Sequence, residues 1–228
     1  MAILSRNRPS ILGPLVGLVC VIALGASLPA FAAETFLDAV LASVAGKTVT
    51  VTDVAIGRAL SLFGLRPSEA PIGKGEVEQV VNAVLLEREA AQLAIGDAPE
   101  ELEAAWRATA DRIGGMPELL AWITQAGLDE SWVKGLVETD LRGHRFIDLR
   151  FRAFAFVSDA DVTATLGPGV HAPDVRERTR EALRIQAIDR AVADWLADAR
   201  TRHSIGFSDT RAPDVSPPFS MPAQGERH

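Results

Sequence analysis

The segment from Val40 to Val54, VLASVAGKTVTVTDV, places two short β-forming runs on either side of a glycine. An isolated two-stranded hairpin is at best marginally stable in water, because it buries too little apolar surface. A chain whose fold begins with such a hairpin must therefore cover it with other elements. The pattern of apolar residues in the rest of the sequence indicates which elements these are.

Beyond Thr52 the apolar residues recur mostly with the period of an α-helix, almost to the end of the chain. Thr52 is expected to cap the first helix, and Ser158 with Asp161 is expected to form a capping box. The segment HSIGF, residues 203–207, is expected to form a third short strand that can pair with the hairpin. The expected helices cover residues 52–63, 76–95, 97–113, 116–126, 129–154, 158–167 and 173–203.

Residues 1–32 have the pattern of a secretory signal peptide. Arg6 and Arg8 precede an uncharged apolar run from Ile11 to Leu28, and the small residues of Ala30-Phe31-Ala32 suit a cleavage site. The alternative is an uncleaved membrane anchor, because the run approaches the roughly 18 residues that begin to span a bilayer. We therefore expect an exported, periplasmic protein with one domain over residues 33–207.

The tail, residues 208–228, contains four prolines and few apolar side chains, so we expect it to be disordered.

The only cysteine, Cys20, lies inside the expected leader. The processed chain would then have no disulfide, no thiolate metal site and no cysteine nucleophile. The full chain carries 23 basic and 30 acidic side chains, and removal of Arg6 and Arg8 with the leader leaves 21 against 30, a net charge of −9. Such a surface repels phosphate, which makes nucleic acid a poor candidate partner.

Signals for catalysis are weak in this sequence. The four histidines lie far apart, and neither a Gly-x-Ser-x-Gly motif nor a phosphate-binding loop occurs. We expect no catalytic residues, no metal site and no cofactor. The histidines are His144, His171, His203 and His228.

A basic cluster on the expected helix 129–154 admits two interpretations. It could contact anionic lipid headgroups or acidic stretches of another protein, or it could be the solvated face of a helix, paired with Glu138, Asp140 and Asp148. We favour the solvated face, because such pairs are common on long helices. The cluster consists of Arg142, His144, Arg145, Arg150 and Arg152.

The order of these elements resembles that of SurA-type periplasmic chaperones. The hairpin VLASVAGKTVTVTDV is followed by VVNAVLLEREAAQLAI, by LAWITQAGLDESWVKGLVETDLRGHRFIDLRF and by VSDADVTATL. The closing segment ALRIQAIDRAVADWLADARTRHSIGF resembles the C-terminal segment that returns, in that family, to the N-terminal module. The resemblance covers almost all of the chain between the leader and the tail.

The resemblance implies a mainly α fold: a multi-helix SurA N-terminal or trigger-factor-like module with a small antiparallel sheet made by the N-terminal hairpin and a C-terminal strand. Two departures matter. Ala45 stands where Asn commonly precedes the turn glycine, so the geometry of the turn can differ. Family members also usually carry parvulin prolyl isomerase domains before the closing helix, and between Leu166 and Val175 this chain has only a short loop. We therefore expect no isomerase activity.

The function that the resemblance implies is that of an ATP-independent holdase. It would bind unfolded or partly folded envelope proteins, such as outer-membrane β-barrel precursors, without catalysing a reaction. The alternative is a non-catalytic assembly subunit that binds one dedicated partner.

Four tryptophans are the candidates for such contacts, since this side chain is common both in cores and in binding hot spots. Trp195 lies on an apolar helix stripe and is expected to be structural, as Trp106 can be. Trp122 and Trp132 flank the turn at Gly127, where an apolar patch can remain exposed. We select these two, with their neighbours Leu119, Leu120 and Ile123, as the predicted client-binding residues.

Overall fold

The computed structural model describes residues 38–93, 95 and 98–208 of the 228-residue chain. All of these residues belong to one unit, Leu37–His228. The predicted leader and the predicted tail beyond Ser208 lie outside the described residues.

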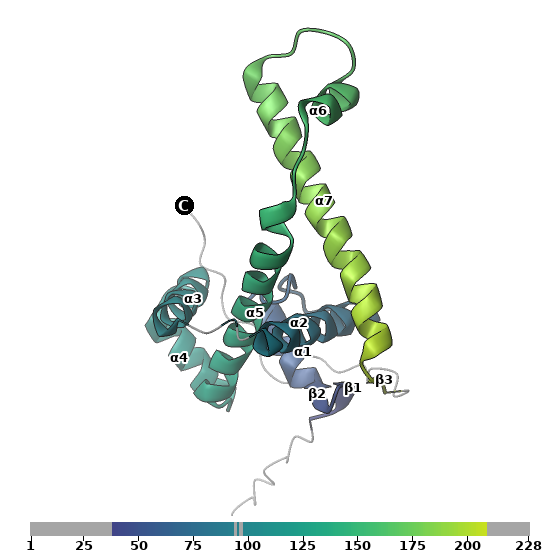
Figure 1. Cartoon of the computed structure of the whole chain (residues 1–228). Coiled ribbons are helices and arrows are strands. Elements are labelled where there is room, and N and C mark those ends of the chain that lie inside the picture. The colour runs from purple at the N-terminus through teal and green to yellow at the C-terminus, as the bar shows by residue number, and fades with distance from the viewer. Residues whose placement is uncertain (1–37, 94, 96–97, 209–228) are drawn as a thin grey trace, which may run out of the picture. The chain divides into compact units, whose positions relative to one another are not determined.

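The described residues form seven α-helices, one short 3-10 helix and three strands (Figure 1). The predicted fold class, mainly helical with a small antiparallel sheet, is confirmed. The strands are β1 Val40–Val44, β2 Lys47–Thr50 and β3 Ile205–Phe207, and the 3-10 helix is η1 Arg152–Phe154. The helices are α1 Val51–Ala59, α2 Lys74–Gln92, α3 Pro99–Arg112, α4 Met116–Gln125, α5 Glu130–Arg150, α6 Asp159–Leu166 and α7 Pro173–Arg202.

The two ends of the described chain meet in the sheet, whose strand order is β2-β1-β3. Strand β3 pairs antiparallel with β1, with Ile205 opposite Val44 and Phe207 opposite Ala42. The third strand therefore joins the hairpin, as expected. One face of the sheet is covered by helices, because Ala42, Val44 and Val49 are almost completely buried.

The hairpin turn keeps an ordinary two-residue geometry despite its alanine. Ala45 and Gly46 both have positive φ, 48° and 89°, the combination that a type I′ turn needs. The backbone of Ala45 is held on both sides: its N–H donates to the Ser204 carbonyl at 2.9 Å, and Arg88 donates to its carbonyl at 3.3 Å. These two contacts, from β3 and α2, hold the alanine in a left-handed conformation that glycine or asparagine would adopt more readily.

The first helix begins two residues earlier than expected. Thr50, and not Thr52, is its N-cap: the Thr50 hydroxyl accepts from the Asp53 N–H, and the Asp53 carboxylate accepts from the Thr50 N–H at 2.9 Å. The prediction of Thr52 was wrong because β2 passes directly into α1 without a loop. The capping box of Ser158 and Asp161 at the start of α6 is confirmed.

The main core lies between the hairpin and helices α1 to α5, with α2 packed along α5. A smaller core continues it at the far end of this helix pair, where Leu86 and Ala90 of α2 meet Phe146 of α5. The tryptophan of α7, Trp195, packs against this second core. It therefore has the structural role expected for it.

Helix α7 is covered unevenly along its length. Near its C-terminus it contacts α2, where Arg200 donates to the Asn82 side chain at 2.8 Å. Near its N-terminus, the described helix that packs against α7 is α6 (Figure 1). Of the apolar stripe predicted for this helix, Ile188 and Ala199 are buried. The other members are half-buried or exposed: Leu183, Ala187, Ala191, Val192, Trp195 and Leu196. The protein thus leaves apolar surface open along α7.

Candidate functional site

Three of the five predicted client-binding residues are not at the surface. Leu119, Trp122 and Ile123 of α4 are 0%, 6% and 3% exposed. Helix α4 packs on α3 and α5, and this face of the helix contributes to the main core. The expectation that an exposed patch forms around Trp122 was wrong, because the short helices after Gly114 pack as closely as the long ones.

The other two predicted residues remain accessible. Leu120 is 37% exposed and Trp132 is 38% exposed. The Trp132 indole N–H donates to Asp53 Oδ1 at 3.1 Å, so the ring is held in one orientation at the edge of the core. Whether these two side chains bind another protein stays a prediction.

The most exposed aromatic side chains of the described residues lie elsewhere, just after α5. Phe154 and Phe156 are 80% and 86% exposed. They follow Phe151 at intervals of two or three residues in the sequence RFRAFAF, and our reading of the pattern did not single them out. Three phenylalanines spaced so closely around a helix end cannot all face one core. This spacing was the sequence signal from which exposed rings at Phe154 and Phe156 could have been predicted.

Next to these phenylalanines, the ends of α2 and α5 enclose a groove of about 410 Å³, which we call the base groove. Leu93, Leu149 and Phe154 stand at its rim and are largely exposed. Phe146, almost fully buried, and the half-buried Phe151 form its floor. The base groove is therefore apolar both at its rim and at its floor.

The floor is stiffened by an aromatic cluster. The Phe146 ring lies 5.0 Å from Trp195 and 6.0 Å from Phe151, centroid to centroid, and Phe151 lies 6.4 Å from Trp195. These separations are typical of favourable tilted and edge-to-face contacts. The cluster joins α5 to α7, so that the position of α7 and the shape of the groove depend on each other.

The basic cluster on α5 is mostly paired with acidic side chains. Arg142 contacts Glu138 at 2.5 Å and Glu87 at 3.2 Å, and Arg145 contacts Glu101 at 2.9 Å. The pair with Glu138 agrees with the interpretation of a helix face paired with neighbouring acids, and Glu87 of α2 and Glu101 of α3 add pairs between helices that the sequence did not indicate.

The last two arginines of this cluster lie at the end of α5. Arg152 pairs with Asp148 at 2.9 Å. Arg150 lines the base groove and has no acidic partner among the described residues, so it gives the groove a positive rim.

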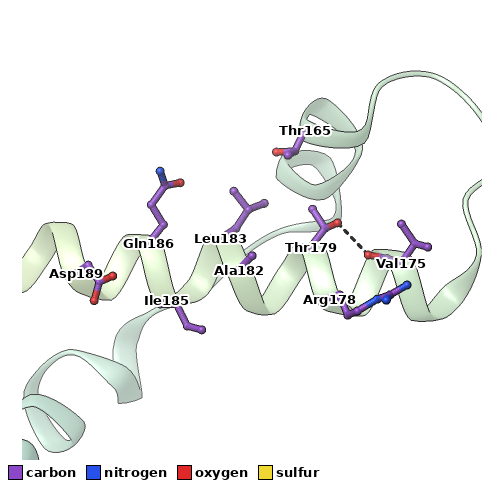
Figure 2. Close-up of a pocket in the computed structure, with 9 residues that line it drawn as sticks. All are labelled: Thr165, Val175, Arg178, Thr179, Ala182, Leu183, Ile185, Gln186 and Asp189. Carbon is purple, nitrogen blue, oxygen red and sulfur yellow. Dashed lines mark hydrogen bonds between the residues drawn. The ribbon is translucent and has the colours of Figure 1, made fainter. Parts of the chain in front are cut away.

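A second, shallower hollow of about 710 Å³ follows α7 on the side of α6 (Figure 2). Val175, Thr179 and Leu183 line it from α7, and Thr165 lines it from α6. It also includes Ile185, which is half-exposed. The neighbouring Arg184 donates to the Arg152 carbonyl of η1 at 3.2 Å, which ties this part of α7 to the segment that carries Phe154.

Neither a protein-family model nor a curated protein matches this chain. Within the described residues, no group of three or more His, Cys, Asp or Glu side chains is arranged to hold a metal ion. No helix in the described part of the chain is long and apolar enough to cross a membrane.

Proposed function

We propose that this protein is an ATP-independent holdase that binds unfolded or partly folded proteins through the base groove. The observation that carries the proposal is the groove itself: exposed Leu93, Leu149 and Phe154 above a floor of the buried Phe146 ring and the half-buried Phe151 ring. Contiguous apolar surface of this kind is uncommon on monomeric proteins unless it binds something. The hollow along α7 extends the surface that an extended chain can follow.

The groove suits weak and reversible contacts. Its rim side chains are already exposed, so that a client gains apolar burial without a rearrangement of the protein. The stiff aromatic floor limits the conformational entropy that is lost on binding. Aggregation-prone strands would thus be shielded and released without a chemical step.

The resemblance to SurA-type chaperones supports the same proposal, with export as its cellular setting. In this proposal residues 1–32 direct the chain to the periplasm, where outer-membrane β-barrel precursors are suitable clients.

The test is light scattering during dilution of an unfolded outer-membrane protein into buffer that contains increasing amounts of the processed protein. We expect aggregation to be suppressed, and we expect Phe154→Ser to weaken the suppression because it removes the most exposed ring of the rim. Leu120→Gln is the matched control: it removes an exposed apolar side chain of α4, at a distance in sequence from the groove. Circular dichroism checks that both variants keep their helices.

The two variants also separate the candidate surfaces. Loss of suppression in Leu120→Gln alone would move the client-binding surface to α4 and to the predicted pair Leu120 and Trp132. Absence of suppression with several unrelated clients would refute the holdase and favour the dedicated assembly subunit. A pull-down from envelope extract that recovers one stoichiometric partner would then identify it.

A further inference from the structure

A cleft of about 460 Å³ separates strand β2 from helix α5, and we call it the edge cleft. One wall is the whole of β2, Lys47–Thr50, and the other is a stretch of α5 from Trp132 to Thr139. Its floor is apolar and is formed by Phe63, Val80, Val84 and Leu136. A groove between a strand edge and a helix has the dimensions in which an extended peptide can lie as an added strand.

The outer edge of β2 is open for such pairing. Strand β1 lies between the other two. On its β3 side, Leu41 and the turn residue Ala45 bond to Ser208 and Ser204, the residues that flank β3. Alternate residues of β1 therefore face β3 and β2. Thr48 of β2 lies opposite Ser43, and Ser43 bonds towards β3. Thr48 and Ser43 are therefore a pair without mutual hydrogen bonds, and the N–H and C=O of Thr48 point away from β1 towards the outer edge of the sheet.

Helix α5 carries a glycine at the cleft that internal packing does not explain. A Cβ added to Gly135 would meet no atom within 4 Å, whereas one added to Gly143, in the same helix, would touch Leu86 at 3.5 Å. A Cβ at Gly143 would thus make an ordinary contact with α2, whereas one at Gly135 would make none. Glycine in a helix interior is unfavourable, and at Gly135 it leaves open space on the side of the cleft that an occupant can use.

The edge cleft also contains an acidic side chain, Asp53. Asp53 lines it and is almost fully buried, and no cation pairs with it in the described part of the chain. Burial raises its pKa, hydrogen bonds from Thr50 and Trp132 oppose this, and the nearby charge of Asp38 raises it further. Lys47 at the mouth is turned to Glu87, 3.9 Å away. An occupant that brings a positive charge to Asp53 is therefore complementary to the cleft.

We propose that the edge cleft binds an extended segment of an unfolded protein as a fourth strand beside β2, with an apolar side chain over the floor and a basic side chain near Asp53. This inference rests on the proposed holdase function and states the conformation and the sequence class of the client. Side chains two residues apart point to the same face of a strand, so the preferred pattern is apolar-x-basic or basic-x-apolar.

The test is a titration of the processed protein with short capped peptides, followed by the ¹H–¹⁵N signal of the Trp132 indole. Trp132→Phe identifies that signal among those of the four tryptophans. The first peptide combines valine and lysine in this pattern, a second has glutamate in place of lysine, and a third keeps the first sequence but is N-methylated at alternate backbone nitrogens. We expect the first to shift the indole signal and the other two to bind at least tenfold more weakly.

Two variants at one position locate the peptide. Gly135→Leu fills the cleft from the side of α5 and should lower the affinity at least tenfold. Gly135→Ala adds a single methyl group where space is free, so it should keep binding within about threefold. Both substitutions favour the helix, so a loss that is confined to leucine is not a loss of folding.

The outcomes separate this inference from the holdase proposal. Equal binding by the wild-type protein and Gly135→Leu, or equal binding of the N-methylated peptide, would overturn the added strand. Suppressed aggregation without any shift of the Trp132 signal would refute the edge cleft and leave the base groove as the client site. A dimer that forms in sedimentation experiments and is lost in Gly135→Leu would show that a second copy of the chain occupies the edge of β2.

Discussion

Arg58 is the most deeply buried charged side chain among the described residues, and it bonds both to the loop between α1 and α2 and to Glu76 in the first turn of α2. Its Nε donates to Glu76 at 2.5 Å, and its Nη1 and Nη2 donate to the carbonyls of Ala70 and Pro71 at 2.5 and 3.1 Å. The loop between α1 and α2 therefore closes around a guanidinium that joins the two helices. Only arginine offers enough donors in a planar fork for this arrangement.

We predict that Arg58→Met lowers the free energy of unfolding by about 3–5 kcal/mol, because it leaves Glu76 and the carbonyls of Ser68, Ala70 and Pro71 without their partner. Urea denaturation followed by circular dichroism measures the change. Arg178→Met is the control: it removes an exposed pair with Asp174 on α7 and should cost no more than about 0.5 kcal/mol. Equal effects of the two substitutions would contradict the role of Arg58.

The same pair predicts a dependence on pH. Burial raises the pKa of Glu76, but hydrogen bonds from Arg58 and the Gly73 N–H, with the charge of Arg58, lower it overall below its ordinary 4.5. A lowered folded pKa means that the stabilisation is present above the ordinary value and is lost as the pH falls through the folded value. Urea midpoints between pH 7 and pH 3 should fall less steeply in Glu76→Gln than in the wild-type protein.

At the hairpin turn, we predict a substitution that raises the free energy of unfolding. Ala45 has φ of 48°, a left-handed value that asparagine adopts more readily. Ala45→Asn should therefore raise the free energy of unfolding by about 0.5–1 kcal/mol. Ala45→Val, which is β-branched, should lower it in the same thermal or urea unfolding assay. Destabilisation by asparagine would indicate that the methyl group of Ala45 makes a contact that outweighs the backbone strain.

At the scale of elements, the apolar period and the turn residues were sufficient to place the helices and the third strand, but not to fix their ends. The first helix, expected to reach residue 63, ends at Ala59, and the helix expected over 129–154 ends at Arg150 and is followed by η1. Capping chemistry was less certain: Thr50 and Thr52 both precede the apolar pattern, and only the direct passage from β2 into α1 selects Thr50. Exposure was the hardest to predict. Trp122 and Phe154 are both aromatic residues near helix ends, and only the packing of α4 on α3 and α5 buries the first and leaves the second exposed.

The contact between α5 and α7 can be tested as a unit. Trp195→Ala removes the ring that lies 5.0 Å from Phe146, and we expect it to lower the free energy of unfolding by about 2–3 kcal/mol, somewhat less than for a fully buried ring. Hydrogen exchange should also become faster in the C-terminal half of α7. Ile185→Ala, at a half-exposed position of the same helix, should change neither quantity by much. An unchanged exchange rate in α7 would show that other contacts hold this helix.

At the scale of the whole molecule, the excess of acidic side chains would set which clients the proposed holdase encounters first. The full chain has a net charge of −7, and the predicted processed chain has −9. The long-range field of the protein attracts basic chains and repels acidic ones, whereas apolar contacts in the base groove do not depend on charge. In the proposed holdase, net charge would therefore control the encounter with a client, and the base groove would control its release.

This separation predicts a salt dependence that differs between clients. An increase of ionic strength from about 10 mM to about 150 mM shortens the screening length from about 30 Å to about 8 Å. The association rate of a basic unfolded client, measured by stopped-flow fluorescence, should fall several-fold over this range, and that of an acidic client should rise. If clients bind in the base groove as proposed, their dissociation rates should change little, because burial of apolar side chains would determine them. If salt instead changed the dissociation rate of both clients equally and left their association rates alone, the surface charge would have no part in the choice of client, and the grooves alone would select it.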